Sequence, residues 1–248
     1  MNKMYKFFVE SNQINNNKIY ISGQDVNHIK NVLRMCVGDK ICVCNKDDSK
    51  NYNCIIEKIG TNISCNICAN IENNSETNTY IHIFQGLPKA DKFEFIIEKC
   101  TEIGVKEITP VIMKRTVVKL EEKDKNKKLE RWQKIAEVAS KQSKRDIILK
   151  VNQIDNFKNI FNYMQNYDIV LLANENEKNV TLKQILKKQK EKINKIAVII
   201  GPEGGIDEEE INICNSNGVN SITLGKRILR TETAPIVVSS NILYELEE

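Results

Sequence analysis

The chain has little of what marks several other classes of protein. Its 248 residues include 2 His, so only His28 and His82 could supply an imidazole to a metal site. No apolar run approaches the roughly 20 residues that a helix needs to span a bilayer. The first residues also lack the apolar core and the small-residue cleavage site of a secretion signal. We therefore expect a cytoplasmic protein with no membrane partner.

A strong charge of one sign is also missing. The formal net charge is +4, which by itself does not indicate nucleic-acid binding. Basic residues gather between Lys114 and Arg145, whereas acidic residues gather at Asp207–Glu210 and Glu245–Glu248. The basic stretch either attracts phosphates or is the solvated face of a helix with interleaved glutamates. The sequence alone leaves both interpretations open.

The eight cysteines invite a zinc interpretation that their context does not favour. Cys42 and Cys44 alternate with Ile41 and Val43 in an expected strand, so both point to one face of it. A cysteine in such a position behaves as a small apolar side chain. The turn residues that usually surround a zinc site are missing, so we predict no metal site. Disulfides are not expected in a cytoplasmic chain.

Short strands separated by turns dominate residues 1–72. A helix interrupts them, and it starts near Ser22 with apolar residues at helical spacing. The expected strands are Phe7–Val9, Lys18–Ile21, Lys40–Cys44, Tyr52–Ile59 and Ser64–Ile71. This pattern predicts a small β-barrel domain.

The pattern changes after the polar run Asn73–Thr79, which we interpret as a linker. Strands then alternate with amphipathic helices, and the expected strands are Ile81–Gln85, Ile108–Met113, Asp168–Ala173, Ile196–Ile200 and Ser221–Leu224. This alternation predicts an α/β domain with a mainly parallel sheet over residues 73–248. Trp132 lies on the apolar stripe of one helix, so we expect it in the core rather than on an RNA-binding surface.

The most informative loop is Gly201-Pro202-Glu203-Gly204-Gly205, directly after an apolar strand. An open α/β sheet binds its ligands at the carboxyl ends of its strands, and glycines let a ligand approach the main chain closely. The acidic start of the next helix, with Asp207 as the expected cap, and the lack of a Lys after the glycines argue against a phosphate. The alternative is a plain turn between strand and helix.

A second loop, Leu224–Pro235, also follows a strand. Thr231 or Thr233 could cap the last helix, expected over Ala234–Leu246 with a proline in its first turn. A cap does not require Arg227 and Arg230 in the approach to the helix, so the arginines indicate a functional loop. The alternative is a solvated, charged loop.

The two loops, GPEGG and LGKRILRTETAP, resemble the C-terminal signature of bacterial small-subunit ribosomal RNA uracil-N3 methyltransferases, the RsmE family of the SPOUT class. Other segments match in the expected order over essentially the whole chain, and they are Val26–Arg34, Lys89–Val105, Ile108–Val111 and Arg131–Ala136. The resemblance implies a PUA-like RNA-binding barrel followed by a SPOUT domain. In that domain helices cover both faces of the sheet, and the C-terminal segment is threaded through a loop as a trefoil knot.

The resemblance also implies an activity, which is methylation of N3 of a uridine in 16S ribosomal RNA with S-adenosylmethionine as the donor. The expected form of the substrate is this RNA within the assembled small ribosomal subunit, with free RNA as the alternative, and the enzyme would be a homodimer without a metal. Carried over position by position, the implied cofactor-binding residues are Leu172, Ala173, Ile200, Gly201, Gly205, Leu224, Gly225, Ile228, Leu229 and Thr231. The expected RNA contacts are Lys30, Arg34, Lys144 and Arg145.

Two residues of the second loop are the catalytic candidates. Loss of the uracil N3 proton places negative charge on the base, and the guanidinium of Arg230 would stabilise that charge. Glu232 would orient Arg230 or act as the general base, with Glu203 and solvent as alternatives. A structural ion pair between Glu232 and Arg227 is an equal alternative.

Two further hypotheses remain at this stage. A non-catalytic RNA-binding or assembly factor on the same scaffold would bind RNA and have no affinity for the cofactor. A SPOUT enzyme that acts on a different RNA would share the cofactor and differ in substrate.

Overall fold

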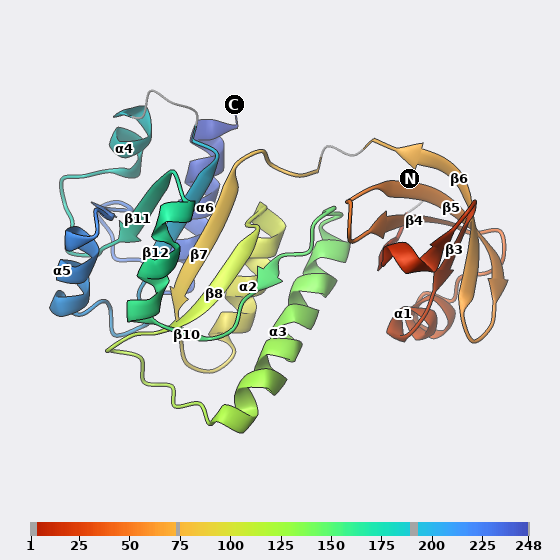
Figure 1. Ribbon diagram of the computed structural model, residues 1–248, viewed down its shortest axis with the longest axis horizontal. Coiled ribbons are helices and arrows are strands. Elements are labelled where there is room, and N and C mark those ends of the chain that lie inside the picture. Colours follow the sequence, from red (N-terminus) through yellow and green to blue (C-terminus); the bar gives the residue numbers. More distant parts are fainter. Residues whose placement is uncertain (1–3, 73–74, 189–192, 248) are drawn as a thin grey trace. The chain divides into compact units, whose positions relative to one another are not determined.

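The computed structural model describes residues 4–72, 75–188 and 193–247, and the chain separates into two compact units (Figure 1). The first unit contains the described residues up to Glu76 together with Ser140–Ile148. The second contains Thr77–Ala139 and the described residues from Leu149 onward. No sequence pattern had indicated that Ser140–Ile148 belongs to the first unit.

The first unit is built on a curled sheet of six strands in the order β1-β4-β5-β6-β3-β2 (Figure 1). The β1–β4 pair is parallel and the other pairs are antiparallel. The strands are β1 (Lys6–Val9), β2 (Ile14–Asn15), β3 (Lys18–Ile21), β4 (Lys40–Asn45), β5 (Asn51–Ile59) and β6 (Ile63–Ile71). The short helical segments are η1 (Ser11–Gln13), α1 (Gln24–Asn27) and the π-helix η2 (His28–Val32). The five expected strands and the helix near Ser22 are confirmed.

Strand β4 shows how side-chain alternation sorts its residues. Ile41 and Val43 are fully buried in the core of the unit, and the two cysteines therefore lie on the other side of the strand. The expectation that Cys42 and Cys44 share a face is confirmed, but this face is not the main core. The thiol of Cys44 lies 3.3 Å from the carbonyl oxygen of Asp146, and burial raises the pKa of this thiol to about 12.

The segment Ser140–Ile148 is held in the first unit by the carboxylate of Asp146. This carboxylate forms a buried ion pair with Lys6, both side chains being at most 5% exposed. It also accepts hydrogen bonds from Asn51 Nδ2 and Ser75 Oγ, each at 2.7 Å. Because a buried ion pair is stable only when its remaining polar atoms are satisfied, these bonds explain how the pair persists.

The second unit contains a parallel sheet in the order β10-β8-β7-β12-β11-β13, with β9 paired to β8. The strands are β7 (Tyr80–Gly86), β8 (Glu107–Ile112), β9 (Lys150–Val151), β10 (Asp155–Asn156), β11 (Ile169–Ala173), β12 (Lys195–Ile200) and β13 (Asn220–Ile222). The helices are α2 (Lys92–Ile103), α3 (Glu122–Gln142), η3 (Phe157–Asn166), α4 (Leu182–Lys188), α5 (Glu208–Ser216) and α6 (Ala234–Leu246).

Helices cover the parallel sheet on both faces. On one face, η3 and α5 pack against the sheet, where Phe157 and Cys214 join Ile199 of β12 in one buried cluster. Helices α2 and α6 pack against each other on the opposite side (Figure 1). Strand β12 is buried from Ile196 to Ile200, as expected for an uninterrupted apolar run in a parallel sheet. The expected α/β class is confirmed, whereas the trefoil knot stays a prediction of the resemblance.

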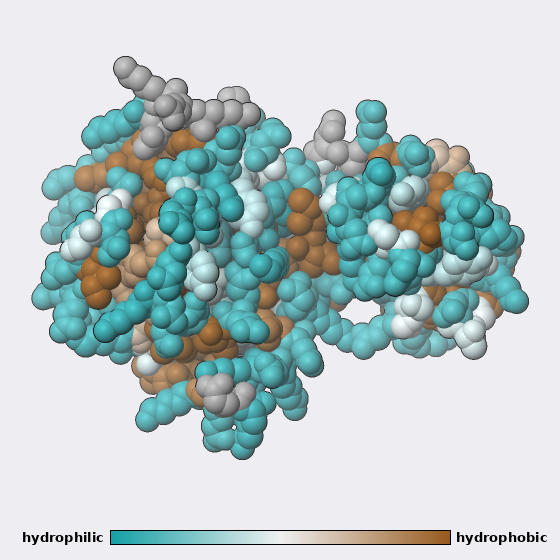
Figure 2. Space-filling view, in the orientation of Figure 1, coloured by the Kyte–Doolittle hydropathy of each residue, from teal (hydrophilic) through white to brown (hydrophobic). Residues whose placement is uncertain are grey.

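The surface is mostly hydrophilic on the face shown in Figure 2, with apolar side chains gathered in smaller patches. Trp132 is 4% exposed and packs edge-to-face on Phe93 of α2, so its expected place in the core is confirmed. No helix within residues 4–72, 75–188 and 193–247 is long and apolar enough to cross a membrane.

Candidate functional site

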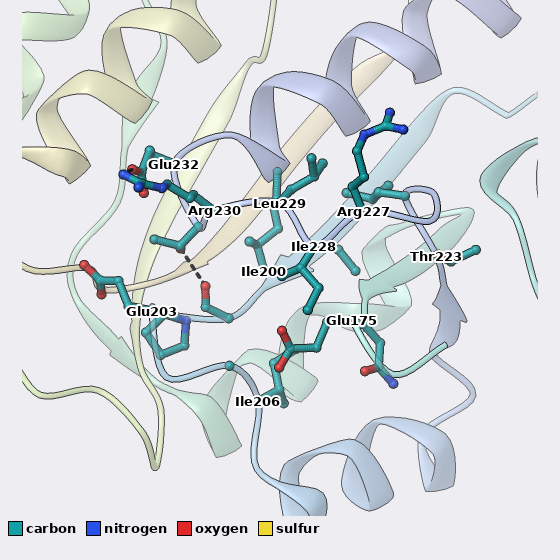
Figure 3. Close-up of a pocket in the computed structure, with 18 of the residues that line it drawn as sticks. Glu175, Ile200, Glu203, Ile206, Thr223, Arg227, Ile228, Leu229, Arg230 and Glu232 are labelled. Atoms are coloured by element: carbon teal, nitrogen blue, oxygen red, sulfur yellow. Dashed lines mark hydrogen bonds and ion pairs between the residues drawn. The ribbon is translucent and has the colours of Figure 1, made fainter. Parts of the chain in front are cut away.

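A pocket of about 410 Å³ lies at the carboxyl ends of β11 and β12, where open α/β sheets bind their ligands (Figure 3). Its volume falls within the range of small-molecule sites. Both loops that the sequence singled out line it, and Ala173–Asn176 forms a further wall. The expected cofactor residues that line the pocket are Ala173, Ile200, Gly201, Gly205, Leu224, Gly225, Ile228, Leu229 and Thr231. Leu172 does not line it, because its side chain is fully buried in the core beneath.

Two glycines, one in β7 and one in the first loop, allow close packing at the edge of the pocket. A Cβ atom on Gly86, at the end of β7, would lie 2.5 Å from the Pro202 ring. A Cβ atom on Gly201 would lie 2.7 Å from the Ile206 side chain. Since both distances are far below van der Waals contact, glycine is required at these two positions.

Thr231 connects the two loops rather than capping the last helix. Its hydroxyl donates a hydrogen bond to the Gly201 carbonyl at 2.7 Å, drawn in Figure 3, and accepts one from Gln85 Nε2 at 2.9 Å. Thr233 occupies the cap position of α6 but makes no side-chain capping bond. The prediction of a threonine side-chain cap was therefore wrong, because the hydroxyl of Thr231 bonds to the first loop instead.

Asp207 caps α5 as expected, and it also fixes the first loop from outside. Its side chain accepts from the Glu209 backbone N–H and forms a capping box with Glu210. Lys114 Nζ lies 2.9 Å from Asp207 Oδ1, and this hydrogen bond lowers the pKa of the Asp207 carboxyl. Arg115 donates to the Gly204 carbonyl at 3.2 Å. Two residues of the basic stretch Lys114–Arg145, Lys114 and Arg115, thus hold the first loop and the start of α5 in place.

The two catalytic candidates lie at one end of the pocket, and their side chains converge (Figure 3). The nearest guanidinium nitrogen of Arg230 lies 3.9 Å from Glu232 Oε1. The Arg230 side chain is 83% exposed and that of Glu232 is 17% exposed. Arg227 also lines the pocket, but its guanidinium is directed away from Arg230 and Glu232 (Figure 3). The structure therefore pairs Glu232 with residues other than Arg227.

Lys92 is a pocket residue that no motif of the two loops predicted. Its ammonium group lies 3.1 Å from Glu203 Oε1 and 3.3 Å from Glu232 Oε2. The hydrogen bond to Glu203 raises the pKa of Lys92. Burial opposes ionisation of Glu203, but hydrogen bonds from backbone groups, including Lys89 N–H, and from Lys92 outweigh it and lower the pKa of the Glu203 carboxyl. Only the resemblance of Lys89–Val105 to the family had pointed to this segment.

Glu175 also lines the pocket without having been predicted. It lies two residues after the end of β11, in a stretch whose sequence resembles an ordinary strand end. A Cβ atom on Gly205 would lie 2.7 Å from Glu175 Oε1, so the carboxylate packs over the bare backbone of the first loop. Gly205 has a φ of +72°, which only glycine adopts readily.

The four expected RNA contacts differ in accessibility. Lys30, Arg34 and Lys144 are exposed, and all three belong to the first unit. Arg145 is 3% exposed and its guanidinium forms an ion pair with Glu76 at 2.8 Å. The structure argues against Arg145 as an RNA contact, because its guanidinium is buried and faces the Glu76 carboxylate instead of solvent.

The cysteines and carboxylates form no evident metal centre in the described parts of the chain. No group of three or more His, Cys, Asp or Glu side chains there is arranged to hold an ion. Cys42, Cys44, Cys65 and Cys68, whose spacing suggested zinc, are free thiols.

A parallel α/β unit with this pocket, preceded by a curled β unit, has the architecture of an RNA methyltransferase. Residues 75–243 match the family model of an RNA methyltransferase domain, and residues 21–67 match an RNA methyltransferase PUA domain. Ribosomal RNA small subunit methyltransferase E of Bacillus subtilis is 35% identical over 98% of each chain. The chain belongs to the family of ribosomal RNA small subunit methyltransferase E.

Two further relatives cover nearly the whole chain. The methyltransferase E of Mesomycoplasma hyopneumoniae is 35% identical over 98% of this chain and 100% of its own. The crystal structure of the enzyme from Neisseria gonorrhoeae, bound to S-adenosyl methionine, superposes with a TM-score of 0.86. It is 25% identical to this chain and covers 98% of both chains.

Proposed function

We propose that this protein transfers the methyl group of S-adenosylmethionine to N3 of a uridine in 16S ribosomal RNA. The observation that carries the proposal is the pocket shared by the two loops, with Arg230 and Glu232 at one end. Membership of the family supports the reaction and the substrate, and the cofactor bound to the relative from Neisseria gonorrhoeae supports the donor.

The residues of the pocket fit this cofactor. Gly201 and Gly205 expose main chain to the cavity, and Ile200, Ile228 and Leu229 supply apolar walls, as an adenosine moiety requires. S-adenosylmethionine, when bound, supplies an electrophilic methyl group on a sulfonium. The acidic start of α5 is compatible with a cationic ligand nearby and disfavours a phosphate.

The protein has two tasks in the reaction, which are to align the uracil and to stabilise its anion. Correct alignment can contribute about 7–11 kcal/mol in favourable cases. As N3 loses its proton and forms the new N–CH₃ bond, the S–CH₃ bond breaks. The exposed guanidinium of Arg230 is free to contact the uracil oxygens, which carry the negative charge. The proton passes to Glu232, Glu203 or solvent.

The position of N3 sets a requirement on the RNA. This atom lies on the Watson–Crick edge, so the target uridine must be unpaired or flipped out of its helix. We assign the positioning of the RNA to the first unit, with Lys30, Arg34 and Lys144 as the contacts. Their exposure in one compact unit supports this assignment, and each contact should contribute to a salt-dependent affinity.

The test is the appearance of 3-methyluridine. The protein is incubated with S-adenosylmethionine and small ribosomal subunits from a strain that lacks the modification, and digested RNA is analysed by mass spectrometry. Free 16S RNA and tRNA serve as parallel substrates. Product on the subunits supports the proposal, whereas product on tRNA alone identifies a different target. Absence of product together with no calorimetric binding of S-adenosylhomocysteine would instead support a non-catalytic RNA-binding factor.

The assembled subunit, a homodimeric state and a cytoplasmic location are part of the same proposal. The family resemblance supports the dimer, and exposed apolar side chains such as Tyr244 on α6, 68% exposed, are available to an interface. Light scattering after gel filtration tests the dimer, since a monomeric mass at micromolar concentration would contradict it.

A further inference from the structure

The ammonium group of Lys92 lies where the two pocket loops meet. Lys92 is the first residue of α2, Glu203 belongs to the first loop and Glu232 to the second. Nζ of Lys92 contacts one carboxylate oxygen of each, at 3.1 Å and 3.3 Å. The cation therefore offsets the mutual repulsion of two carboxylates that lie on the same side of the pocket.

The two carboxylates are held differently. Glu203 also accepts a hydrogen bond from the Lys89 backbone N–H at 3.1 Å, so main chain helps to fix it. Glu232 has two cationic neighbours among the described residues, Lys92 at 3.3 Å and Arg230 at 3.9 Å. The Arg230 side chain is 83% exposed and that of Lys92 is 36% exposed, so solvent screens the contact with Arg230 more strongly.

We propose that Lys92 is a positioning residue for the methyl transfer, acting through Glu232. This inference rests on the function proposed above. By engaging Glu232, Lys92 keeps that carboxylate from closing on Arg230, so the guanidinium stays available to the uracil anion. Without Lys92, Glu232 pairs tightly with Arg230, and the charge that should stabilise the anion is neutralised by a protein group.

The test compares Lys92→Met, Lys92→Arg and the control Lys99→Met. Lys99 lies on the same helix and pairs with Glu98 and Glu102 away from the pocket, so its substitution removes an equal charge. For each variant, kcat and KM are measured on small subunits, and the Kd for S-adenosylhomocysteine is measured by calorimetry. Unfolding temperatures are compared as well, because exposed ion pairs stabilise a fold little.

We expect Lys92→Met to lower kcat by about 10- to 100-fold, the range for a misplaced catalytic group. The S-adenosylhomocysteine Kd and the unfolding temperature should stay close to those of the wild type. Lys92→Arg should restore most of the turnover, and Lys99→Met should resemble the wild type. In a Glu232→Gln background, Lys92→Met should have no further effect, because the two residues act as one unit.

Each other outcome has a definite meaning. An active wild type with unchanged kcat in Lys92→Met overturns the role of Lys92 and leaves the proposed function intact. Equal losses of kcat and cofactor affinity, or independent losses in the double variant, also overturn it. A wild type that binds the cofactor analogue but forms no 3-methyluridine refutes the proposed function, and the inference falls with it.

Discussion

Gly205 and Gly218 share a left-handed backbone, with φ of +72° and +73°, but differ in their surroundings. A Cβ atom at Gly205 would lie 2.7 Å from Glu175 Oε1, whereas one at Gly218 would meet nothing within 4 Å. Alanine substitutions at these two glycines therefore separate the effect of backbone strain from the effect of adding an atom beside the pocket.

Gly205→Ala should weaken binding of S-adenosylhomocysteine by about tenfold, because the added methyl group and the displaced Glu175 carboxylate both change the wall of the pocket. Gly218→Ala carries the same strain, of order 1–3 kcal/mol, and should leave the affinity unchanged. Calorimetry gives the two affinities and denaturant unfolding gives the two stabilities. Equal affinities in the two variants would show that Gly205 is needed for backbone conformation alone.

Arg230→Ala should lower kcat by about 10²–10³-fold, the usual cost of removing one group that stabilises an anionic transition state. Binding of S-adenosylhomocysteine should be largely retained, since the guanidinium is 83% exposed and not part of the packed walls. Arg227→Ala is the matched control, because it removes an arginine of the same loop whose guanidinium is directed away from Arg230 and Glu232 (Figure 3). Retained turnover in Arg230→Ala would remove this residue from the catalytic role.

At the scale of elements, strand and helix positions followed from the sequence much better than side-chain partners did. The apolar run Ile196–Ile200 predicts a buried strand, and the place of the first loop after it follows from the rule for open sheets. Lys92 and Glu175 carry no such signal, because their importance depends on segments far apart in the sequence. The burial of Arg145 likewise depends on its ion pair with Glu76. The basic stretch around Arg145 gives no sign of this distant partner.

A polar cluster around the buried side chain of His82 connects β7 and β8 to Tyr167, the residue that follows η3. His82 is 3% exposed, and its ring nitrogens contact the Tyr167 hydroxyl and, at 2.8 Å, Thr109 Oγ1. Burial lowers the pKa of His82 to about 4. Burial alone would raise the pKa of nearby Glu107, but hydrogen bonds, that from Tyr80 first, outweigh it and lower this pKa to about 2.

The lowered pKa of His82 predicts that the fold loses stability in acid. Between about pH 6.5 and 4 the unfolded chain binds a proton at this histidine and the folded chain does not, so stability falls as the pH falls through this window. The loss is at most about 3 kcal/mol. Denaturant unfolding of the wild type and of His82→Gln at pH 7.5, 6 and 4.5 measures it. The variant should show a flatter dependence, and identical slopes would contradict the prediction.

At the scale of the whole molecule, the first unit depends on residues that lie late in the sequence. Asp146→Ala should leave the Lys6 ammonium buried without its counter-charge, which costs about 3–5 kcal/mol. Asp48→Ala removes an exposed ion pair with Lys50 and a hydrogen bond from the Lys50 backbone N–H, and should cost only about 1 kcal/mol. Thermal unfolding followed by a probe in the first unit distinguishes them. Similar stabilities would mean that the Lys6–Asp146 pair contributes little.

The return of Ser140–Ile148 to the first unit also constrains how the protein is made. A chain grows from its N-terminus, and domains generally fold as they emerge during synthesis. Here Lys6 is synthesised long before Asp146, the carboxylate that neutralises it in the folded unit. The N-terminal unit therefore cannot reach its final state until more than half of the chain has been translated, so its folding must overlap in time with that of the unit that follows.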